Sequence, residues 1–242
     1  MRIAAFFSLV FLPMPTPAAD FERTIPPGCG QMVMVTTEDW RASAATVRCF
    51  ERSAPAASWV PVGRAMPALL GERGLAWGLG LHRVPRDAAR HKREGDRRSP
   101  AGVFRITEAF GAAGKIAGLN LPAWTLTPTL EAVDDPASRF YNRIVDRAKI
   151  AQPDWRSAER MGEMPDYALG FVVAHNPKHV SGAGSCIFLH LWNGERRGTA
   201  GCTVLRERDL TALARWLDAA REPVLMQLPL AEVPRAISAR GF

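Results

Sequence analysis

The chain has 242 residues, of which 47% are hydrophobic, and its formal net charge at pH 7 is +7. This length and apolar content suffice for one domain with a substantial core, and no linker separates two halves, so we expect residues 20–242 to form a single domain. The densest basic stretch, residues 83–98, has acidic and glycine interruptions and no interleaved aromatic residues. It therefore predicts a solvated loop and argues against a nucleic-acid partner.

The N-terminus has the pattern of a secretory signal peptide. Arg2 is followed by the short apolar run Ile3–Met14, and small residues up to Ala19 precede Asp20. The run is too short for a spanning helix, and no other segment of the sequence is apolar enough to cross a membrane. We expect cleavage of residues 1–19, a periplasmic or secreted mature protein and no stable membrane span. An uncleaved anchor or a hydrophobic N-terminal strand is the alternative.

Short strands with turn residues between them dominate the remainder of the chain. β-Branched and aromatic residues, punctuated by glycine and proline, mark each predicted strand and indicate a mostly β domain with a few helices. The predicted strands are Gln31–Thr37, Ala44–Glu51, Trp59–Val62, Leu75–Leu81, Val103–Ile106, Leu169–Ala174, Cys186–Trp192 and Val224–Leu230.

Two segments depart from this pattern. Residues 112–166 are mixed in character and interrupted by prolines, so we expect short helices and loops that cover one face of the sheet and the active site. Residues 206–220 have leucines at helical spacing, acidic residues in the first turn and Pro223 beyond the end, which predicts a helix.

The sequence contains four cysteines, and an even number in an oxidising compartment suggests disulfides. Cys29 and Cys49 flank a predicted pair of strands, so we expect a disulfide between them. We expect Cys186 and Cys202 to stay unpaired, because a bond between them would remove the candidate nucleophile.

Cys202 is that candidate. A thiol attacks a carbonyl only as its thiolate, which requires a nearby base or positive field. Cys202 lies among small residues (Gly-Thr-Ala-Gly-Cys-Thr) that let a substrate approach, and it shortly precedes a predicted helix N-terminus, which favours negative charge modestly. On these local grounds alone, a buried inert cysteine is an equal alternative.

His190 is the candidate base, twelve residues before Cys202 at the end of an apolar predicted strand. Asn193-Gly194 predicts a hairpin after that strand. A tight two-residue turn would place Cys202 opposite Ser185, so the Cys202–His190 pair requires a wider turn or a bulge. Cys186 stands roughly 13 Å from His190 along an extended strand, too far for His190 to activate it.

Three segments resemble the signature of the L,D-transpeptidase (YkuD-type) family. Residues 188–190 (Phe-Leu-His) and 199–202 (Thr-Ala-Gly-Cys) match its histidine strand and its Ser/Thr-x-Gly-Cys box. Residues 95–104 (Gly-Asp-Arg-Arg-Ser-Pro-Ala-Gly-Val-Phe) are similar to its Gly-Asp-x-x-Thr/Ser-Pro-x-Gly-x-Phe turn and strand. The resemblance implies a YkuD-like β-sandwich or sheet domain, a cysteine nucleophile that uses no metal or other cofactor, and peptidoglycan stem peptides as substrate.

By matching position, the resemblance also implies roles for individual residues. Cys202 would form the thioester and His190 would transfer the proton. Gly201 and the Cys202 amide would hold the oxyanion, and Thr199 would orient the turn beside the substrate.

The match has three departures. Leu191 stands where the family commonly has glycine, Ala200 where it often has histidine, and Val204 where it usually has arginine. The missing arginine leaves the acceptor open. The expected reaction passes the acyl group to an amine of another stem peptide or to the lysine of a wall-linked protein. Transfer to water, as in an amidase or carboxypeptidase, and a non-catalytic wall-binding module are the alternatives.

Other polar residues are candidates for binding. Arg143, in the 112–166 segment, is the candidate partner for a substrate carboxylate. Four other residues in this segment or directly after it either contact substrate or pack the segment onto the sheet: Tyr141, Asn142, Trp155 and Tyr167. His175 could line the site from a neighbouring strand. His175 and His179 have the spacing of a helical zinc pair, but Pro177 lies between them, so a zinc hydrolase with His190 as a third ligand is a weaker alternative.

Overall fold

The structure is a computed structural model and describes residues 24–85, 88–194 and 197–233. The expected signal peptide, residues 1–19, therefore lies outside the described residues. Within the described ranges, no helix combines the length and the apolar character that crossing a membrane requires.

A ten-stranded sheet forms the body of the protein, in the order β10-β11-β12-β3-β2-β1-β13-β5-β4, with β6 beside β5. An additional pairing between β10 and β5 closes the sheet on itself. Its strands are β1 (Gln31–Thr37), β2 (Ala44–Glu51), β3 (Val60–Leu69), β4 (Leu75–Trp77), β5 (Ser99–Gly111), β6 (Ala123–Thr125), β10 (Leu169–Val173), β11 (Phe188–Leu191), β12 (Thr203–Leu205) and β13 (Val224–Pro229).

The hydrophobic core lies between this curved sheet and the helix α3 (Glu207–Trp216). β1 is buried along its whole length because it lies between β2 and β13, and its apolar run, residues 32–35, is at most 1% exposed. Leu210 and Leu213 of α3 join the same core, as the helical spacing of the leucines predicts. The mostly β fold expected from the sequence is confirmed, although β3 and β5 are longer than predicted and β4 and β11 are shorter.

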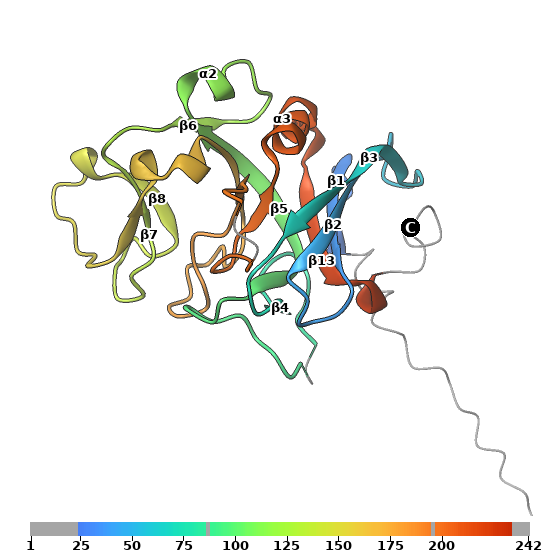
Figure 1. The fold of residues 1–242 in the computed structure, drawn as a ribbon, viewed down its shortest axis with the longest axis horizontal. Coiled ribbons are helices and arrows are strands. Elements are labelled where there is room, and N and C mark those ends of the chain that lie inside the picture. Colours follow the sequence, from blue (N-terminus) through green and yellow to red (C-terminus); the bar gives the residue numbers. More distant parts are fainter. Residues whose placement is uncertain (1–23, 86–87, 195–196, 234–242) are drawn as a thin grey trace, which may run out of the picture.

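Residues 112–166 contain the short helices and loops that the sequence predicts, but they also carry a second sheet that it does not predict. Its three strands have the order β8-β7-β9, and Figure 1 shows β7 and β8 at the side of the molecule away from β1, β2 and β3. We call this part the inserted sheet; it comprises β7 (Leu130–Val133), β8 (Arg143–Asp146) and β9 (Ala158–Arg160), while the short helix α2 (Ala113–Ile116) precedes it.

The hairpin predicted from Asn193-Gly194 is wrong. β11 and β12 are parallel neighbours, with Leu189 opposite Thr203 and His190 opposite Val204. The connection therefore carries the chain back to the starting end of β11, so Cys202 enters β12 beside the beginning of β11.

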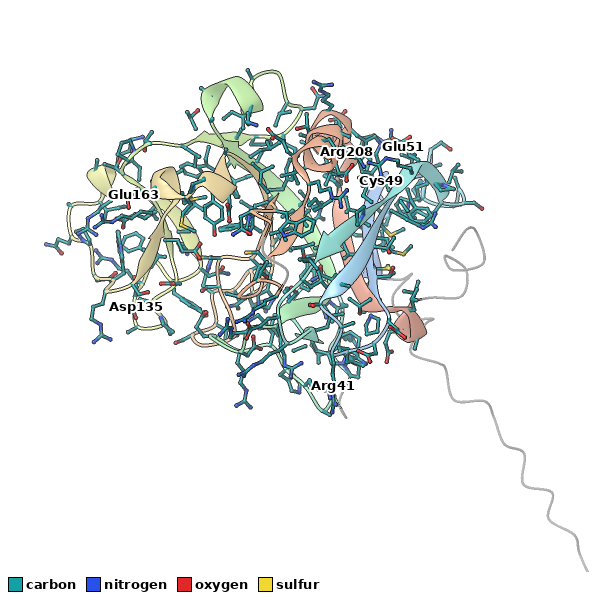
Figure 2. The ribbon with its side chains drawn as sticks, in the orientation of Figure 1. Arg41, Cys49, Glu51, Asp135, Glu163 and Arg208 are labelled. Atoms are coloured by element: carbon teal, nitrogen blue, oxygen red, sulfur yellow. The ribbon has the colours of Figure 1, made fainter. Side chains whose placement is uncertain are left out.

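The disulfide expected between Cys29 and Cys49 is also absent, since both thiols are free. Cys49 pairs with Val33 in the register of β1 and β2, whereas Cys29 lies four residues earlier in the chain. That offset corresponds to roughly 13 Å of extended chain, beyond the reach of a disulfide. Figure 2 shows Cys49 far from Asp135 and Glu163, which belong to the region of the inserted sheet.

Buried polar contacts hold the inserted sheet to the body. The Tyr141 hydroxyl donates to Glu94 (2.5 Å) and accepts from the amide of Gly184 (3.1 Å). The side chain of Asn142 accepts from the amide of Cys186 (2.9 Å) and donates to the carbonyl of His175 (3.0 Å). These bonds reach the loop just before β11, so the inserted sheet and that loop are positioned together.

We expect Tyr141→Phe to lower the free energy of unfolding by about 1–3 kcal/mol, because it leaves the buried amide of Gly184 without its acceptor and removes one of the two hydroxyl groups that donate to Glu94. Urea unfolding measures the change. Ser181→Ala is the matched control: its exposed hydroxyl donates to Pro136 of the inserted segment, and we expect a change within about 0.5 kcal/mol. Equal effects of the two substitutions would contradict the role assigned to Tyr141.

Candidate active site

The turn before β12 is held by hydroxyl groups from two distant parts of the chain. The carbonyl oxygen of Cys202 accepts hydrogen bonds from Thr199 Oγ1 (2.5 Å) and from Ser99 Oγ (3.3 Å). Ser99 also accepts from the amide of Gly71 (2.8 Å). The segment 95–104 and the cysteine box, recognised separately in the sequence, therefore meet at one carbonyl.

The Cys202 thiol is half-buried and contacts the backbone at the start of β11. Its sulfur accepts from the amide of Phe188 (3.3 Å) and donates to the carbonyl of Cys186 (3.5 Å). Burial raises the pKa of Cys202 to about 12, and the carboxylate of Glu159 acts in the same direction, while the Phe188 amide and Lys92 oppose it. The thiol is therefore protonated at neutral pH.

His190 lies on the face of β11 that also carries Phe188. The Tyr167 ring packs edge-on against both, with centroid distances of 5.1 Å to His190 and 5.6 Å to Phe188. Burial lowers the pKa of His190 to about 4. Hydrogen bonds with the backbone of Leu191 and Asp166 act in the opposite direction but are weaker. The imidazole is therefore neutral at neutral pH, which is the form that accepts a proton.

The thiol and the imidazole lie on the same side of the sheet. Cys202 packs against the apolar cluster that contains Phe188 and Tyr167, and Tyr167 in turn contacts His190. In the parallel register Cys202 is level with Phe188, one two-residue step, roughly 7 Å, before His190. Within the described residues, the thiol is hydrogen-bonded to Cys186 and Phe188 rather than to the imidazole.

A carboxylate reaches this site from the inserted sheet. Glu159, in β9, accepts a hydrogen bond from the hydroxyl of Tyr167 (2.5 Å). Burial raises the pKa of Glu159, an effect that the Tyr167 bond opposes. Tyr167 therefore connects an acid of the inserted sheet to the ring of His190.

A cavity of about 440 Å³ lies between the inserted sheet and the body. Arg143 and Trp124 line it, as do Cys186 and Phe188, the two residues whose backbone contacts the Cys202 thiol. The cavity thus reaches residues whose backbone contacts the thiol, although neither Cys202 nor His190 is among its lining residues, and it carries a partly apolar wall with one guanidinium group.

The structure supports a substrate-binding position for Arg143 but gives Tyr141 and Gly201 structural roles. Arg143 is exposed at the cavity, as a substrate-binding residue must be. Tyr141 is only 2% exposed and braces the inserted sheet, so the packing interpretation replaces substrate contact. The amide of Gly201 donates to Thr199 Oγ1 (3.1 Å), so Gly201 helps to hold the turn and its amide is not available to an oxyanion in this arrangement.

His175 borders the cavity, but both nitrogens of its buried ring are engaged. Nδ1 accepts from the amide of Leu79 (3.3 Å), and Nε2 lies 3.0 Å from the carbonyl of Ala183. Burial lowers the pKa of His175 to about 4. Among the described residues, no three His, Cys, Asp or Glu side chains are grouped to hold a metal ion, so His175, His179 and His190 do not form the alternative zinc set.

Sequence reasoning did not consider Glu159, and it left Asn142 and Tyr167 between packing and substrate contact. Asn142 has a φ of 60° and bonds to two loops at once, and Tyr167 joins Glu159 to His190. Polar side chains within a mixed segment were the only signal available, and that signal does not distinguish a brace from a surface residue.

Comparisons with known proteins agree with the motifs. A family model described as the L,D-transpeptidase catalytic domain (YkuD) matches residues 41–226. No curated protein matches the chain. Among solved structures, the chain is similar to the helical cell shape determining protein Pgp2 from Campylobacter jejuni, with 12% identity and a TM-score of 0.40. That likeness covers 88% of this chain and 55% of the Pgp2 chain, so the protein spans about half the length of Pgp2.

The raised pKa of Cys202 predicts its reactivity. Below about pH 12 the thiolate fraction rises tenfold per pH unit, so we expect alkylation by iodoacetamide to rise about tenfold per unit between pH 7 and pH 10, without a plateau. Peptide mapping by mass spectrometry follows Cys202 alone. A short cysteine peptide, the control, levels off near pH 9. A plateau for Cys202 at or below that pH would contradict the burial effect.

Proposed function

The chain belongs to the family of L,D-transpeptidase catalytic domains, and we propose that it is an exported cysteine acyltransferase of peptidoglycan. Cys202 attacks a carbonyl of a stem peptide and forms a thioester while the leaving amine departs. An amine of a second stem peptide, or a lysine of a wall-linked protein, then attacks the thioester and regenerates the thiol. The proposed location is the periplasm or the cell exterior, reached through the signal peptide at residues 1–19.

The observation that supports this proposal best is the pair of hydrogen bonds that Ser99 and Thr199 donate to the Cys202 carbonyl. Ser99 belongs to one family motif and Thr199 to the other, and both fix the residue that the second motif marks as nucleophile. Their convergence supports the proposal because it fixes the turn at Cys202, whose side chain packs against the cluster that contains Phe188 and Tyr167.

His190 is the proposed base. It is neutral at pH 7, so its ring can accept the proton from the Cys202 sulfur and return it to the leaving amine. Before the transfer, the Cys202 thiol and the His190 imidazole are both uncharged. Transfer requires the imidazole to close the two-residue offset toward the sulfur, and the resulting thiolate and imidazolium then stabilise each other.

The backbone and the cavity complete the proposed mechanism. Because Gly201 donates its amide to Thr199, the amide of Cys202 is the proposed donor to the oxyanion. Arg143 is the proposed partner of a stem-peptide carboxylate, since a guanidinium binds a carboxylate through paired hydrogen bonds. Val204, at the position of the usual family arginine, is buried opposite His190 and offers no charge to the acceptor.

We expect Cys202→Ala to abolish product formation from purified muropeptides while the protein still folds, because it removes the proposed thioester-forming sulfur and the neighbouring Cys186 thiol is buried and donates to the carbonyl of Val133. Mass spectrometry of the products separates new dimers from shortened stems. Cys49→Ala, which removes a buried thiol from a distant strand, is the control and retains activity. Turnover by Cys202→Ala would refute the nucleophile, and shortened stems without dimers from the unaltered chain would make water the acceptor.

We expect Arg143→Gln to raise KM about tenfold with little change in kcat, because it removes binding that substrate and transition state share. Steady-state kinetics with stem peptides that carry or lack the free carboxylate measure the effect. Arg147→Gln is the control, since Arg147 lies in the same segment but lines a different cavity. A fall in kcat with unchanged KM would instead place Arg143 at the reacting bond.

A further inference from the structure

One residue of the basic stretch 83–98 is buried, although the sequence predicts a solvated loop there. The side chain of Lys92 is 3% exposed. Its ammonium group donates to Asp96 Oδ1 (2.6 Å) and to the carbonyl of Arg93 (2.7 Å). A lysine is almost never buried this fully unless its charge is paired, and Asp96 is the partner of Lys92.

The stem of Lys92 lies between two glycines of the active-site loops. A Cβ atom on Gly184 would meet Lys92 Cγ at 3.1 Å, and one on Gly201 would lie 3.8 Å from Lys92 Cε. Gly184 is in the loop before β11, and Gly201 directly precedes Cys202. The absence of side chains at these two positions therefore gives a cation a buried place against the turn of the nucleophile.

The carboxylate of Asp96 does not fully neutralise the charge of the Lys92 ammonium group. This carboxylate also accepts hydrogen bonds from the amides of Arg93 (2.8 Å) and Arg98 (2.9 Å), so backbone dipoles share its negative charge. Asp96 therefore fixes the ammonium group in place and leaves part of its field directed at the surroundings.

Ionisable groups of several elements bear on the Cys202 thiol. Glu159 comes from β9, Tyr167 from the turn Pro165–Tyr167 and Lys92 from the loop before β5, while His190 of β11 contacts the ring of Tyr167. The thiol of Cys186 is also close enough to interact with that of Cys202. Glu159 raises the pKa of Cys202, and Lys92 lowers it.

We propose that Lys92 is a positioning residue that supplies the fixed positive charge stabilising the thiolate form of Cys202. This role rests on the proposed function, in which the thiolate is the attacking species. The proton leaves the Cys202 sulfur for His190, and Lys92 forms and breaks no bond. In the alternative, the Lys92–Asp96 pair only braces the turn of residues 92–98.

Two substitutions in this pair separate the alternatives, because they remove opposite charges from the same ion pair. Lys92→Met removes the cation, so we expect the alkylation rate of Cys202 at a fixed pH to fall about tenfold, with the line of log rate against pH displaced in parallel. Asp96→Asn removes the neutralising anion and leaves the cation, so its rate equals or exceeds that of the unaltered chain. A bracing role predicts changes of the same sign in both variants.

Iodoacetamide is the probe, and peptide mapping follows the alkylation of Cys202 between pH 7 and pH 10. Circular dichroism establishes that each full-length variant folds. Equal falls in both variants, or no fall in Lys92→Met, would overturn the proposal. If Lys92→Met does not fold, the Asp96→Asn arm still decides, since a slower rate there rejects the electrostatic role. Alkylation requires no peptide substrate, so this result stands apart from success or failure of the muropeptide assay.

Discussion

The parallel pairing of β11 with β12 is the constraint on which the site depends. Parallel neighbours cannot be joined by a tight turn, so the chain leaves β11, crosses back and enters β12 from the same end. This return places Cys202 level with Phe188, on the face that also carries His190. In a tight antiparallel hairpin the same residue would lie opposite Ser185, away from the imidazole.

The environment produced by this pairing favours uncharged groups. Burial holds the thiol protonated and the imidazole neutral, because charge separation in a weakly polar setting is unfavourable. A site of this kind can stabilise an ion pair only through fixed charges and dipoles. Lys92 and the amide of Phe188 favour the thiolate, and Glu159 opposes it, so the reactivity of the sulfur depends on the balance between the body and the inserted sheet.

The inserted sheet is therefore part of the site rather than a separate cover. Tyr141 and Asn142 anchor it to the loop that leads into β11, and Glu159 reaches Tyr167 beside the imidazole. The cavity between the inserted sheet and the body adjoins the same loop. A displacement of this sheet would thus change the position of the loop, the field at the sulfur and the shape of the cavity together.

Local patterns in the sequence were sufficient for most strands, for the helix and for the family, because each depends on neighbouring residues. β1 and β2 have the predicted bounds, and α3 lies inside the predicted helix. Cys202 and His190 could be proposed from short motifs that lie within residues 41–226, the range that the family model matches. The three strands of the inserted sheet have only three or four residues each, too short for an alternating pattern to be recognised.

Only the tertiary structure decided which distant groups meet. Strand register separates Cys29 from Cys49, and strand direction brings Cys202 beside β11, but neither is encoded in nearby residues. Lys92 belongs to a charged stretch whose other members give no sign that one ammonium is buried against the glycine before the thiol. The sequence by itself determined the family and which residues are candidates for the chemistry. Long-range pairing of the strands decided the electric field in which they act, since that field depends on burial and on charges brought from elsewhere in the chain.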